Sequence, residues 1–486
     1  MLNLFILALE ASTSSAKAML YDTLSETFEI ATKPYKTDYT NEYTAFRADS
    51  VYGQLLALGC ELVHGRAVDV VALASAWHSV GLFDTSLYPV TPMFQWSSTY
   101  GSEMSRRLRR DEGFVRDYYG ITGCMANAIY PYFKLKKMSD DLNLSDYRIM
   151  GQGTYNNLRM TGRQVTTDCI LSGSGLLNIH TLNYASELLS DLNISSRSLS
   201  EICTYRESLT LCDEAAKTLG IKSGIPVVPT CSDGALNQVG VGALGHGVMT
   251  FSVGTSGALR LSVDSPRLSK NCSTWCYRSP LSWLSGAATN GGTNCIEWFR
   301  RMAFDSPMDY GEIESKIKHQ ETTPVFLPFI FGERCPGWDD EMLGGFHNLR
   351  ALHDRYDLYL GIEEGILFNL FQCYQSLISE CGEPERIRFS GGILHSARWS
   401  QMCADIFGKE LEIDKCEHAS LIGAVTLAKE RQGLIESVER YNPPPAGVIR
   451  PDSSKAELYR KKYASYINCY NEIKLKNEMD SYWEKR

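Results

Sequence analysis

Continuous apolar runs alternate with amphipathic stretches along this chain. Residues 4–9 and 69–74 are almost entirely apolar, which is typical of short strands buried on both faces of a sheet. Residues 361–380 instead repeat their apolar positions at helical spacing. The same pattern predicts further strands at residues 225–229 and 386–390, and helices at residues 102–112, 211–219 and 399–407. Strands and helices that alternate in this way predict the α/β class.

One strand–loop–strand unit occurs twice, about half a chain apart. The first copy has strands at residues 4–9 and 18–21 around a loop of small hydroxyl residues. The second has strands at residues 248–253 and 258–263 around a glycine-rich loop. A repeated unit indicates duplication, with one domain in each half. We therefore expect domains at 1–243 and 244–486, with a linker at Pro443–Pro445 and a helical tail from about residue 446.

Composition and charge narrow the class of protein. The 486 residues are 44% hydrophobic and 22% charged, which excludes a chain that is disordered throughout. The net charge of −9 argues against a basic nucleic-acid binder. The apolar run at the N-terminus is too short for a membrane span and lacks the basic flank of a signal peptide. We expect a cytoplasmic protein without nucleic-acid or membrane partners.

The 15 cysteines form no CxxC pair and are spread along the whole chain. Disulfide frameworks are found mainly in short secreted proteins. The sequence therefore predicts reduced thiols that are mostly buried in the core.

Two loops carry the residue types that bind phosphate. In Gly254-Thr255-Ser256-Gly257 the glycines leave backbone N–H groups accessible, and the hydroxyls add donors. Thr13-Ser14-Ser15 has the same character, with Lys17 as a nearby cation. Each loop alone also fits a plain tight hairpin. As a pair, they favour a nucleotide site.

Residues 240–245 match the pattern GxGxxG of dinucleotide sites. Such a site needs a strand before the glycines and a helix after them. Here another predicted strand follows at residue 248. We interpret these glycines as a close-packed crossover between the two halves.

Asp233-Gly234 directly follows the strand predicted at residues 225–229. An aspartate at a strand end can lie on the floor of a cleft and accept a proton from a substrate hydroxyl. An Asx turn or a helix N-cap is the structural alternative. Its place at the junction of the two halves favours the functional interpretation.

Other candidate residues also follow predicted strands. The Trp77-His78 pair and Trp96 could contact a polyol, and Ser390-Gly391-Gly392 allows the close approach of a flat ligand such as adenosine. Each of these signals is weak by itself, because a lone histidine or tryptophan more often has a structural role.

Together these segments resemble the FGGY family of carbohydrate kinases. The resemblance runs from Leu7 to about Leu427 and is carried by ordered motifs. They are residues 10–17, Asp233-Gly234, residues 254–257, residues 390–392 with Trp399 and residues 404–405, and the segment 326–338. Residues 167–177 and 326–338 look most like the gluconate-kinase and xylulose-kinase branches.

The resemblance implies two actin-like (ribonuclease-H-like) domains with a central cleft, and the phosphorylation of a sugar or sugar acid by ATP with Mg²⁺. Gluconate stands slightly ahead of xylulose as the acceptor, and a homodimer is the suggested assembly. Asp233 would be the catalytic base and would also bind the substrate, together with Trp77, His78 and Trp96. Glu10 and Asp233 would bind Mg²⁺. The residues implied for ATP are Thr13, Ser14, Ser15, Lys17, Gly254, Thr255, Ser256, Gly257, Asn294, Gly391 and Gly392.

The chain departs from the family pattern in three places. Glu10 replaces an aspartate, Ser12 replaces a glycine, and the Trp-x-Asp-x-Arg motif reads Trp96-Ser97-Ser98-Thr99-Tyr100. These changes leave open an alternative, a degenerate kinase fold that binds its ligands without turnover. Gluconate also needs a cation for its carboxylate, and the sequence does not identify one.

Overall fold

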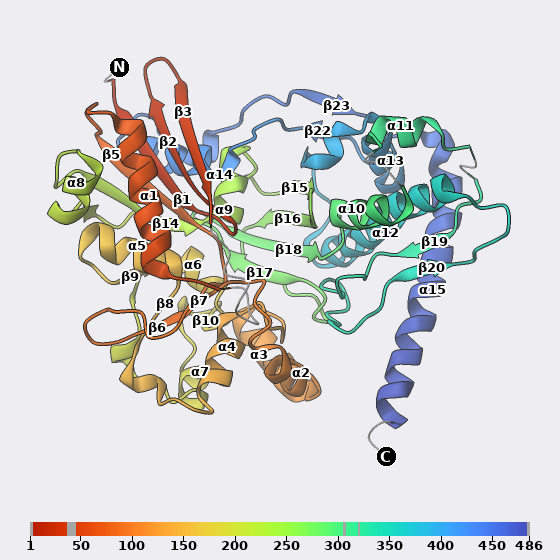
Figure 1. The fold of residues 1–486 in the computed structure, drawn as a ribbon, viewed down its shortest axis with the longest axis horizontal. Coiled ribbons are helices and arrows are strands. Elements are labelled where there is room, and N and C mark those ends of the chain that lie inside the picture. The colour runs from red at the N-terminus through yellow and green to blue at the C-terminus, as the bar shows by residue number, and fades with distance from the viewer. Residues whose placement is uncertain (1–2, 36–44, 305–307, 319–320, 484–486) are drawn as a thin grey trace.

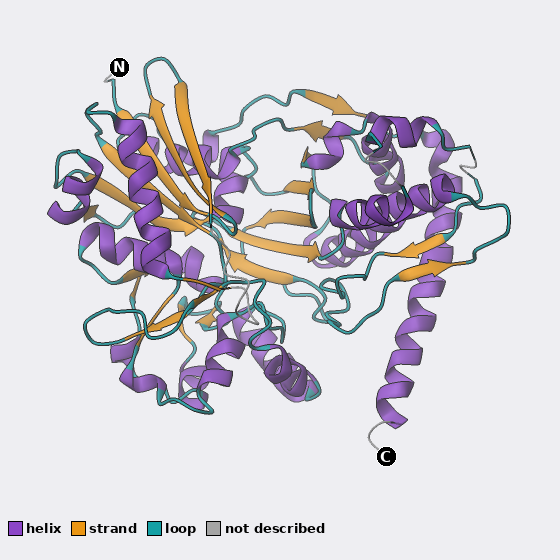
Figure 2. Ribbon diagram, viewed as in Figure 1, coloured by secondary structure: helices purple, strands orange, loops and turns teal. Residues whose placement is uncertain are grey.

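The protein is described by a computed structural model that covers residues 3–35, 45–304, 308–318 and 321–483, with side chains to residue 476. Figure 1 shows two lobes side by side, with the N-terminus on the first lobe and the C-terminal helix on the second. Both lobes combine strands and helices (Figure 2). The predicted α/β class is confirmed.

The first lobe is built on a six-stranded sheet in which β1, β5 and β14 run parallel to one another. Helices α1, α5 and α8 pack on one face of this sheet, and α9 and α14 pack on the other. In sheet order the strands are β13 (Leu209–Thr210), β14 (Pro226–Ser232), β5 (Val70–Ser75), β1 (Phe5–Ala11), β2 (Ser15–Asp22) and β3 (Thr27–Pro34). The helices are α1 (Ala48–Val63), α5 (Gln152–Thr161), α8 (Asp213–Leu219), α9 (Asp233–Gly240) and α14 (Ala419–Arg431).

A layer of short elements, most of them between β5 and β14 in the sequence, lies below the first sheet in Figure 1. Its strands form two-stranded sheets: β4 (Ala45–Phe46), β6 (Gly81–Phe83), β7 (Met93–Phe94), β8 (Arg148–Met150), β9 (Val165–Thr167), β10 (Leu177–Asn178), β11 (Asn183–Tyr184) and β12 (Glu201–Cys203). Its helices are α2 (Ser102–Arg109), α3 (Glu112–Thr122), α4 (Pro131–Met138), α6 (Asp168–Ser172) and α7 (Ser186–Asp191).

The second lobe has a seven-stranded sheet that is covered by the long helix α12. In sheet order the strands are β17 (Trp275–Arg278), β18 (Trp283–Thr289), β16 (Gly257–Val263), β15 (Val248–Val253), β21 (Arg386–Ser390), β22 (Leu411–Ile413) and β23 (Gly447–Ile449). A small sheet joins β19 (Val325–Leu327) to β20 (Gly345–His347). The helices are α10 (Thr293–Ala303), α11 (Tyr310–Ser315), α12 (Arg355–Cys381), α13 (Ala397–Phe407) and α15 (Ala456–Trp483).

Helix α14 joins the two lobes, because it follows strands of the second sheet in the sequence but packs on the first. It crosses α9 at a contact between glycines and main chain. A Cβ atom on Gly240 would lie 1.9 Å from the carbonyl oxygen of Ala419, and one on Gly423 would lie 2.0 Å from that of Leu236. The glycines at residues 240–245 therefore serve close packing, as interpreted from the sequence.

Two expectations about element boundaries are wrong. The helix expected at residues 102–112 is two helices, because Asp111 caps α3 by accepting hydrogen bonds from the backbone N–H groups of Gly113 and Phe114. The tail expected to be helical from about residue 446 begins instead with β23, which pairs with β22, and α15 starts at Ala456. Pro443–Pro445 therefore leads back to the second sheet.

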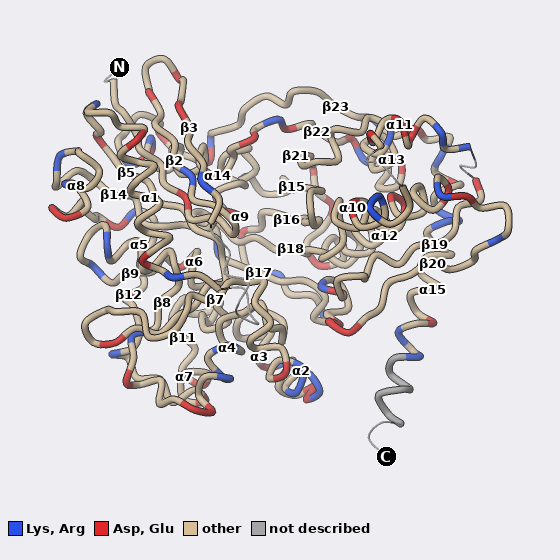
Figure 3. The backbone as a smooth tube through the Cα atoms, viewed as in Figure 1, with Lys and Arg blue, Asp and Glu red and all other residues tan. Residues whose placement is uncertain are grey.

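The cysteines and the surface agree with the sequence analysis. Every one of the 15 cysteines is free, and most are buried. Acidic and basic residues are interspersed over both lobes, with a basic concentration on α2 (Figure 3). None of the helices in the described ranges is long and apolar enough to span a membrane.

Candidate active site

The parallel strands of the first sheet bring distant residues together at one edge. Strands β1, β5 and β14 are adjacent and end at the same edge. Glu10 lies at the end of β1, the Trp77-His78 pair follows β5, and Asp233 follows β14. The carboxyl edge of a parallel sheet is where ligands of open α/β folds bind.

A cleft of about 360 Å³ opens at this edge, which is within the range of about 300–1,000 Å³ typical of small-molecule sites. Both halves of the chain contribute to it. Its walls are formed by Glu10, Ser12, Thr13, Ser14, Lys17, Asp233, Gly234, Asn237, Ser252, Arg260, Glu417, Ala419 and Ser420. Five of the predicted site residues are therefore brought into one cavity: Glu10, Thr13, Ser14, Lys17 and Asp233.

The Glu10 carboxylate accepts hydrogen bonds from two different elements that line the cleft. It lies directly opposite Lys17 in the β1–β2 pairing, and its Oε1 accepts a hydrogen bond of 3.1 Å from the Lys17 ammonium. Its Oε2 accepts one of 2.5 Å from the hydroxyl of Ser420, in the first turn of α14. The side chain is almost completely buried. Glu10 thus links the first hairpin to a helix from the far end of the sequence.

Asp233 is the first residue of α9, and its carboxylate faces the cleft. The N-cap is Ser232, whose hydroxyl accepts a hydrogen bond from the N–H of Ala235, so the structural alternative for Asp233 does not apply. Oδ1 of Asp233 accepts a hydrogen bond of 2.7 Å from the N–H of Gly234. Burial raises the pKa of Asp233 to about 6, and the negative charge of Glu10 adds to the increase.

Trp77 and His78 lie in an aromatic cluster next to Asp233. The Trp77 ring fills the space over Gly234, where a Cβ atom would lie 2.6 Å from it. The ring centroid of Tyr277 is 5.1 Å from that of Trp77 and 5.5 Å from that of His78. Burial lowers the pKa of His78 to about 3, so the imidazole is neutral at physiological pH. Its Nδ1 donates to the carbonyl of Gly173.

Trp96 contacts the first loop directly. Its indole N–H donates a hydrogen bond of 2.9 Å to the hydroxyl of Thr13. In the same loop the Ser12 hydroxyl donates to the carbonyl of Ser15 over 2.7 Å. These bonds shape the loop between β1 and β2, so Trp96 orients the loop as well as lying near the cleft.

The glycine-rich residues of the second lobe form a separate corner. Gly254 and Gly257 flank the turn between β15 and β16, and the Gly291-Gly292 turn packs so closely on it that a Cβ atom on Gly292 would lie 2.5 Å from the carbonyl oxygen of Gly254. Gly391, with φ of +105°, approaches the end of β15 in the same way. Thr255 and Ser256 are exposed at this corner, and Gly391 and Gly392 are exposed beside it.

Asn294 belongs to the framework of this corner. Its Oδ1 accepts a hydrogen bond of 2.8 Å from the N–H of Gly292, and its Nδ2 donates one of 2.8 Å to the carbonyl of Asn290. Both ends of the side chain are therefore engaged within its own turn. Its contribution to a ligand site is to hold the glycines in place.

Sequence patterns that define the FGGY family match nearly the whole chain. The pattern of the family's N-terminal domain matches residues 5–240, and that of its C-terminal domain matches residues 249–429. The chain belongs to the FGGY family of carbohydrate kinases. It is accordingly a phosphotransferase enzyme, for which ATP and a sugar are the expected ligands.

The relatives of this FGGY kinase act on more than one sugar. The gluconokinase of Bacillus subtilis is 24% identical over 490 residues, which covers 96% of this chain and 95% of the relative. The structure of gluconate kinase from Lactobacillus acidophilus matches with a TM-score of 0.92 at 26% identity, over 97% of this chain and 98% of the other. A ligand-bound xylulose kinase from the same organism matches with 0.91 at 26% identity, over 96% and 98%. The fold of this chain is that of FGGY kinases, which have two actin-like domains.

Several residues of this FGGY kinase were missed by the sequence analysis. Ser252, Arg260 and Ser420 all contribute to the cleft, and Arg334 lies beside the aromatic cluster. The available signal was a charged residue, Arg260, within an otherwise apolar strand. Ser420 carried no signal, because only the folded chain brings α14 to β1.

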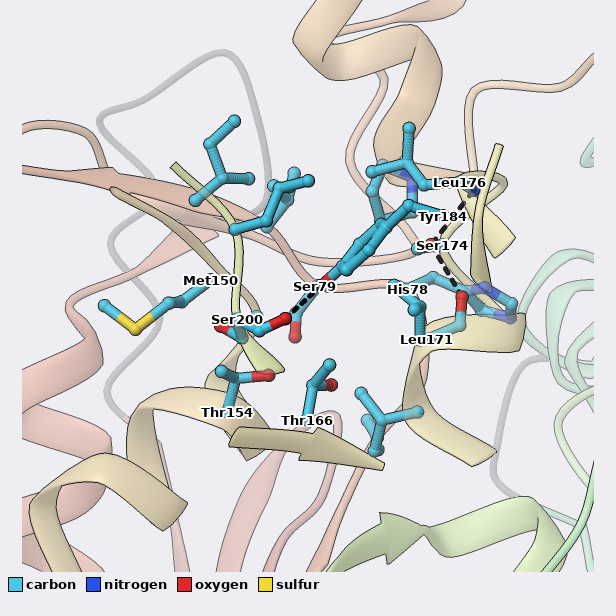
Figure 4. A pocket seen from close by; sticks show the side chains of 17 residues that line it. His78, Ser79, Met150, Thr154, Thr166, Leu171, Ser174, Leu176, Tyr184 and Ser200 are labelled. Atoms are coloured by element: carbon cyan, nitrogen blue, oxygen red, sulfur yellow. Dashed lines mark hydrogen bonds between the residues drawn. The ribbon is translucent and has the colours of Figure 1, made fainter. Parts of the chain in front are cut away.

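A second cavity is lined in part by His78, and Asp233 is not among its lining residues (Figure 4). Its volume of about 50 Å³ holds only a few water molecules at roughly 10–15 Å³ each. Tyr184 lies across it, and its hydroxyl donates a hydrogen bond of 3.0 Å to the carbonyl of Ser200. This cavity is too small for a sugar of five or six carbons. The cleft at Asp233 has the volume and holds five predicted site residues, so it is the candidate active site of the kinase.

Proposed function

We propose that this FGGY kinase transfers the γ-phosphoryl group of ATP to a terminal hydroxyl of a sugar or sugar acid. Gluconate is the first candidate acceptor and xylulose is the alternative. The proposal assigns sugar binding and the base mainly to residues 1–243 and ATP binding mainly to residues 244–486. The observation that carries it is the half-buried Asp233 in a cleft that both halves of the chain line.

Asp233 acts as the general base in this proposal. With a pKa of about 6 it is mostly ionised at neutral pH and still basic enough to take a proton from an alcohol. Gly234 holds Oδ1, which leaves Oδ2 for the substrate hydroxyl. As the proton passes to Oδ2, the hydroxyl oxygen bonds to the γ-phosphorus, the bond to the bridging oxygen breaks, and ADP leaves with that electron pair.

The phosphates of ATP would lie between the two loops. Thr13, Ser14, Ser15 and Lys17 approach from the first lobe, and the exposed corner of Gly254, Thr255, Ser256, Gly257, Gly391 and Gly392 approaches from the second. Backbone N–H groups in such turns bind phosphate without a basic surface. This accounts for a nucleotide site on a protein whose net charge is −9.

The residues of the cleft fit Mg²⁺ bound together with phosphates. Mg²⁺ in such sites takes one or two carboxylates and fills its other positions with water and phosphate oxygens. Glu10 and Asp233 supply two carboxylates close enough for the charge of one to raise the pKa of the other. These two residues would hold the ion in this proposal. When bound, the ion would neutralise phosphate charge.

The test is ADP release with gluconate and xylulose, for the wild type, Asp233→Asn and Asp213→Asn. Asp213 is the matched control, because it is also the first residue of a helix but is exposed. We expect Asp233→Asn to lose about a thousandfold or more in kcat while keeping ATP affinity, and Asp213→Asn to keep both. Full activity of Asp233→Asn would refute the base.

The alternative, a degenerate kinase fold that binds its ligands without turnover, predicts a different experimental result. Glu10, Ser12 and the altered Trp96 loop motivate it, but Glu10 keeps a carboxylate in the cleft and Trp96 keeps a contact with the first loop. A folded wild type that binds ATP but releases no ADP with any polyol, ketose or aldonate would establish that alternative.

A further inference from the structure

Two guanidinium groups beside the candidate active site have no partner in the described part of the chain. The Nε atoms of Arg260 and Arg334 are both buried and make no hydrogen bond, and neither side chain forms an ion pair among the described residues. A charged group removed from water is costly unless it is paired. An anion that belongs to a ligand would remove this cost.

Arg260 extends from the second sheet towards Asp233. It lies on β16 between Leu259 and Leu261, whose side chains point the other way into the core. Its Nε is 3.6 Å from the position that a Cβ atom on Gly234 would occupy, which places it beside the proposed base. Burial lowers the pKa of Arg260, the carboxylate of Asp233 opposes this, and the charge of Arg334 lowers the pKa further. The two arginines are thus electrostatic neighbours.

Arg334 lies near the aromatic cluster and near Arg260, because its charge acts on the side chains of both. The next residue, Cys335, donates its N–H to the carbonyl of Ala288 on β18, and Ala288 pairs with β16 two positions from Arg260. The charge of Arg334 acts on His78 and Tyr277, since it helps to lower the pKa of His78 and opposes the rise that burial causes at Tyr277.

The surroundings of Arg334 include a further positive charge and hydroxyl groups. The ammonium group of Lys134 is buried on α4 and donates to the carbonyls of Ala128 and Ile129. Burial lowers the pKa of Lys134 to about 7, and its charge also acts on His78. The hydroxyls of Tyr130 and Tyr277 are hydrogen-bonded to each other at 2.7 Å.

The cleft is therefore electrostatically divided. One side has the carboxylates of Glu10 and Asp233, with Lys17 already paired to Glu10. Arg260 also lines the cleft, and Arg334 lies next to it with the phenol, indole and imidazole rings of the aromatic cluster. The Nε atoms of both arginines have no described partner. A linear acceptor with a hydroxyl at one end and an anion at the other matches this division. Guanidinium groups suit a planar carboxylate, because their N–H groups bind both oxygens at once.

We propose that Arg260 and Arg334 bind the carboxylate of the acceptor, which makes the substrate a sugar acid and places its terminal hydroxyl at Asp233. This inference rests on the proposed phosphorylation of a terminal hydroxyl. It assigns the cation that gluconate requires, and it makes Arg260 the residue that selects against a neutral ketose.

The first test measures binding without turnover. D-Gluconate and D-sorbitol form a matched pair, because sorbitol has a hydroxymethyl group where gluconate has its carboxylate. Isothermal titration of the wild type is expected to show gluconate bound at least about tenfold more tightly than sorbitol, since charged hydrogen bonds contribute this much. Arg334→Gln is expected to remove the preference, and Arg334→Lys to restore part of it. Arg450→Gln, an exposed arginine paired with Glu410, is the control that keeps it.

A wild type that binds the two ligands equally, or an Arg334→Gln variant that keeps the preference for gluconate, would overturn the proposal. Thermal melts of each variant establish that it is folded. Because the readout is affinity, a protein that binds gluconate in this way but releases no ADP would refute the proposed function and leave the carboxylate site standing.

The second test separates a role in acceptor binding from a role on phosphate. If Arg260 binds the acceptor carboxylate, Arg260→Gln raises KM for gluconate and changes kcat/KM for xylulose much less. A kcat that falls equally for both acceptors, together with a raised KM for ATP, would assign Arg260 to the transferred phosphoryl group and overturn its place in the carboxylate site.

Discussion

The hairpins β1–β2 and β15–β16 share one pattern but offer different chemistry to the cleft. In the first, Glu10 lies directly opposite Lys17, in the second-to-last residue pair before the loop. In the second, the corresponding pair is Ser252 and Ala258, which carry no charge. At this position the first hairpin thus supplies a pair of opposite charges. The second hairpin supplies the glycine-rich main chain of its loop and, two residues further along β16, the charge of Arg260.

The difference shows what duplication of a sequence unit predicts. It predicts the backbone of both hairpins, because the alternation of apolar strand and small-residue loop is the same. It does not predict where along each hairpin the charges lie, because these depend on what each hairpin faces. The first faces α14, which supplies Ser420 to Glu10, and the second faces the Gly291-Gly292 turn.

The largest expected difference is in the loss of kcat/KM when matched positions of the two hairpins are substituted. We expect Glu10→Gln to reduce kcat/KM about 10–100-fold, the range seen when a carboxylate that supports a metal or a charged group is lost. Ser252→Ala, at the matched position of the second hairpin, is expected to change it less than about twofold. Steady-state kinetics of the two variants checks this. Equal losses would mean that the hairpins share their chemistry as well as their backbone.

A smaller effect is expected when the glycine corner is altered. A Cβ atom on Gly254 meets nothing within 4 Å and its φ is not positive, so Gly254→Val is expected to leave the melting temperature unchanged. If phosphate approaches this turn, the same variant raises KM for ATP by about tenfold, or about 1.4 kcal/mol. Gly345→Val, equally open and far from the cleft, is the control. An unchanged KM for ATP would exclude phosphate contact at Gly254.

The smallest effect is a displacement of the pH profile. Since Asp233 must be ionised to act as a base and its pKa is about 6, kcat/KM is expected to fall about tenfold per unit below pH 6 and to level off above it. The charge of Glu10 raises this pKa, so Glu10→Gln moves the acid limb of its remaining activity to lower pH. Ser252→Ala leaves the limb in place. A limb that does not move in Glu10→Gln would show that the two carboxylates are not coupled.

Local patterns were sufficient for most elements of the fold. Strands β15 and β21 have the bounds that their apolar runs predict, and α12 extends the predicted helix by only a few residues. The helix expected at residues 102–112 failed because a single capping residue, Asp111, outweighs a charged stretch that is otherwise compatible with one helix. β23 was missed because three residues with one exposed valine carry no strand pattern.

The site could be predicted only where its residues lie in motifs. Glu10, Lys17 and Asp233 follow from the family resemblance and lie in one cleft. Arg260 does not, because its place beside Asp233 depends on how β16 packs against the first lobe. Arg334 lies in the segment 326–338 that carries the resemblance, but only the folded chain shows that its buried Nε has no described partner. Asn294 shows the reverse case. The family resemblance implies a role in ATP binding, whereas both ends of its side chain are hydrogen-bonded within its own turn.

The path of the chain through α14 has a consequence for dissection of the enzyme. The chain passes from the first lobe to the second after α9, returns as α14, and crosses again before β23. A fragment that ends at residue 243 would lack the helix that covers one face of β1 and β5, and would expose apolar surface there. The two halves are therefore expected to be insoluble when expressed separately and to recover when they are produced together. Any bending between the lobes must occur where these three crossings lie side by side.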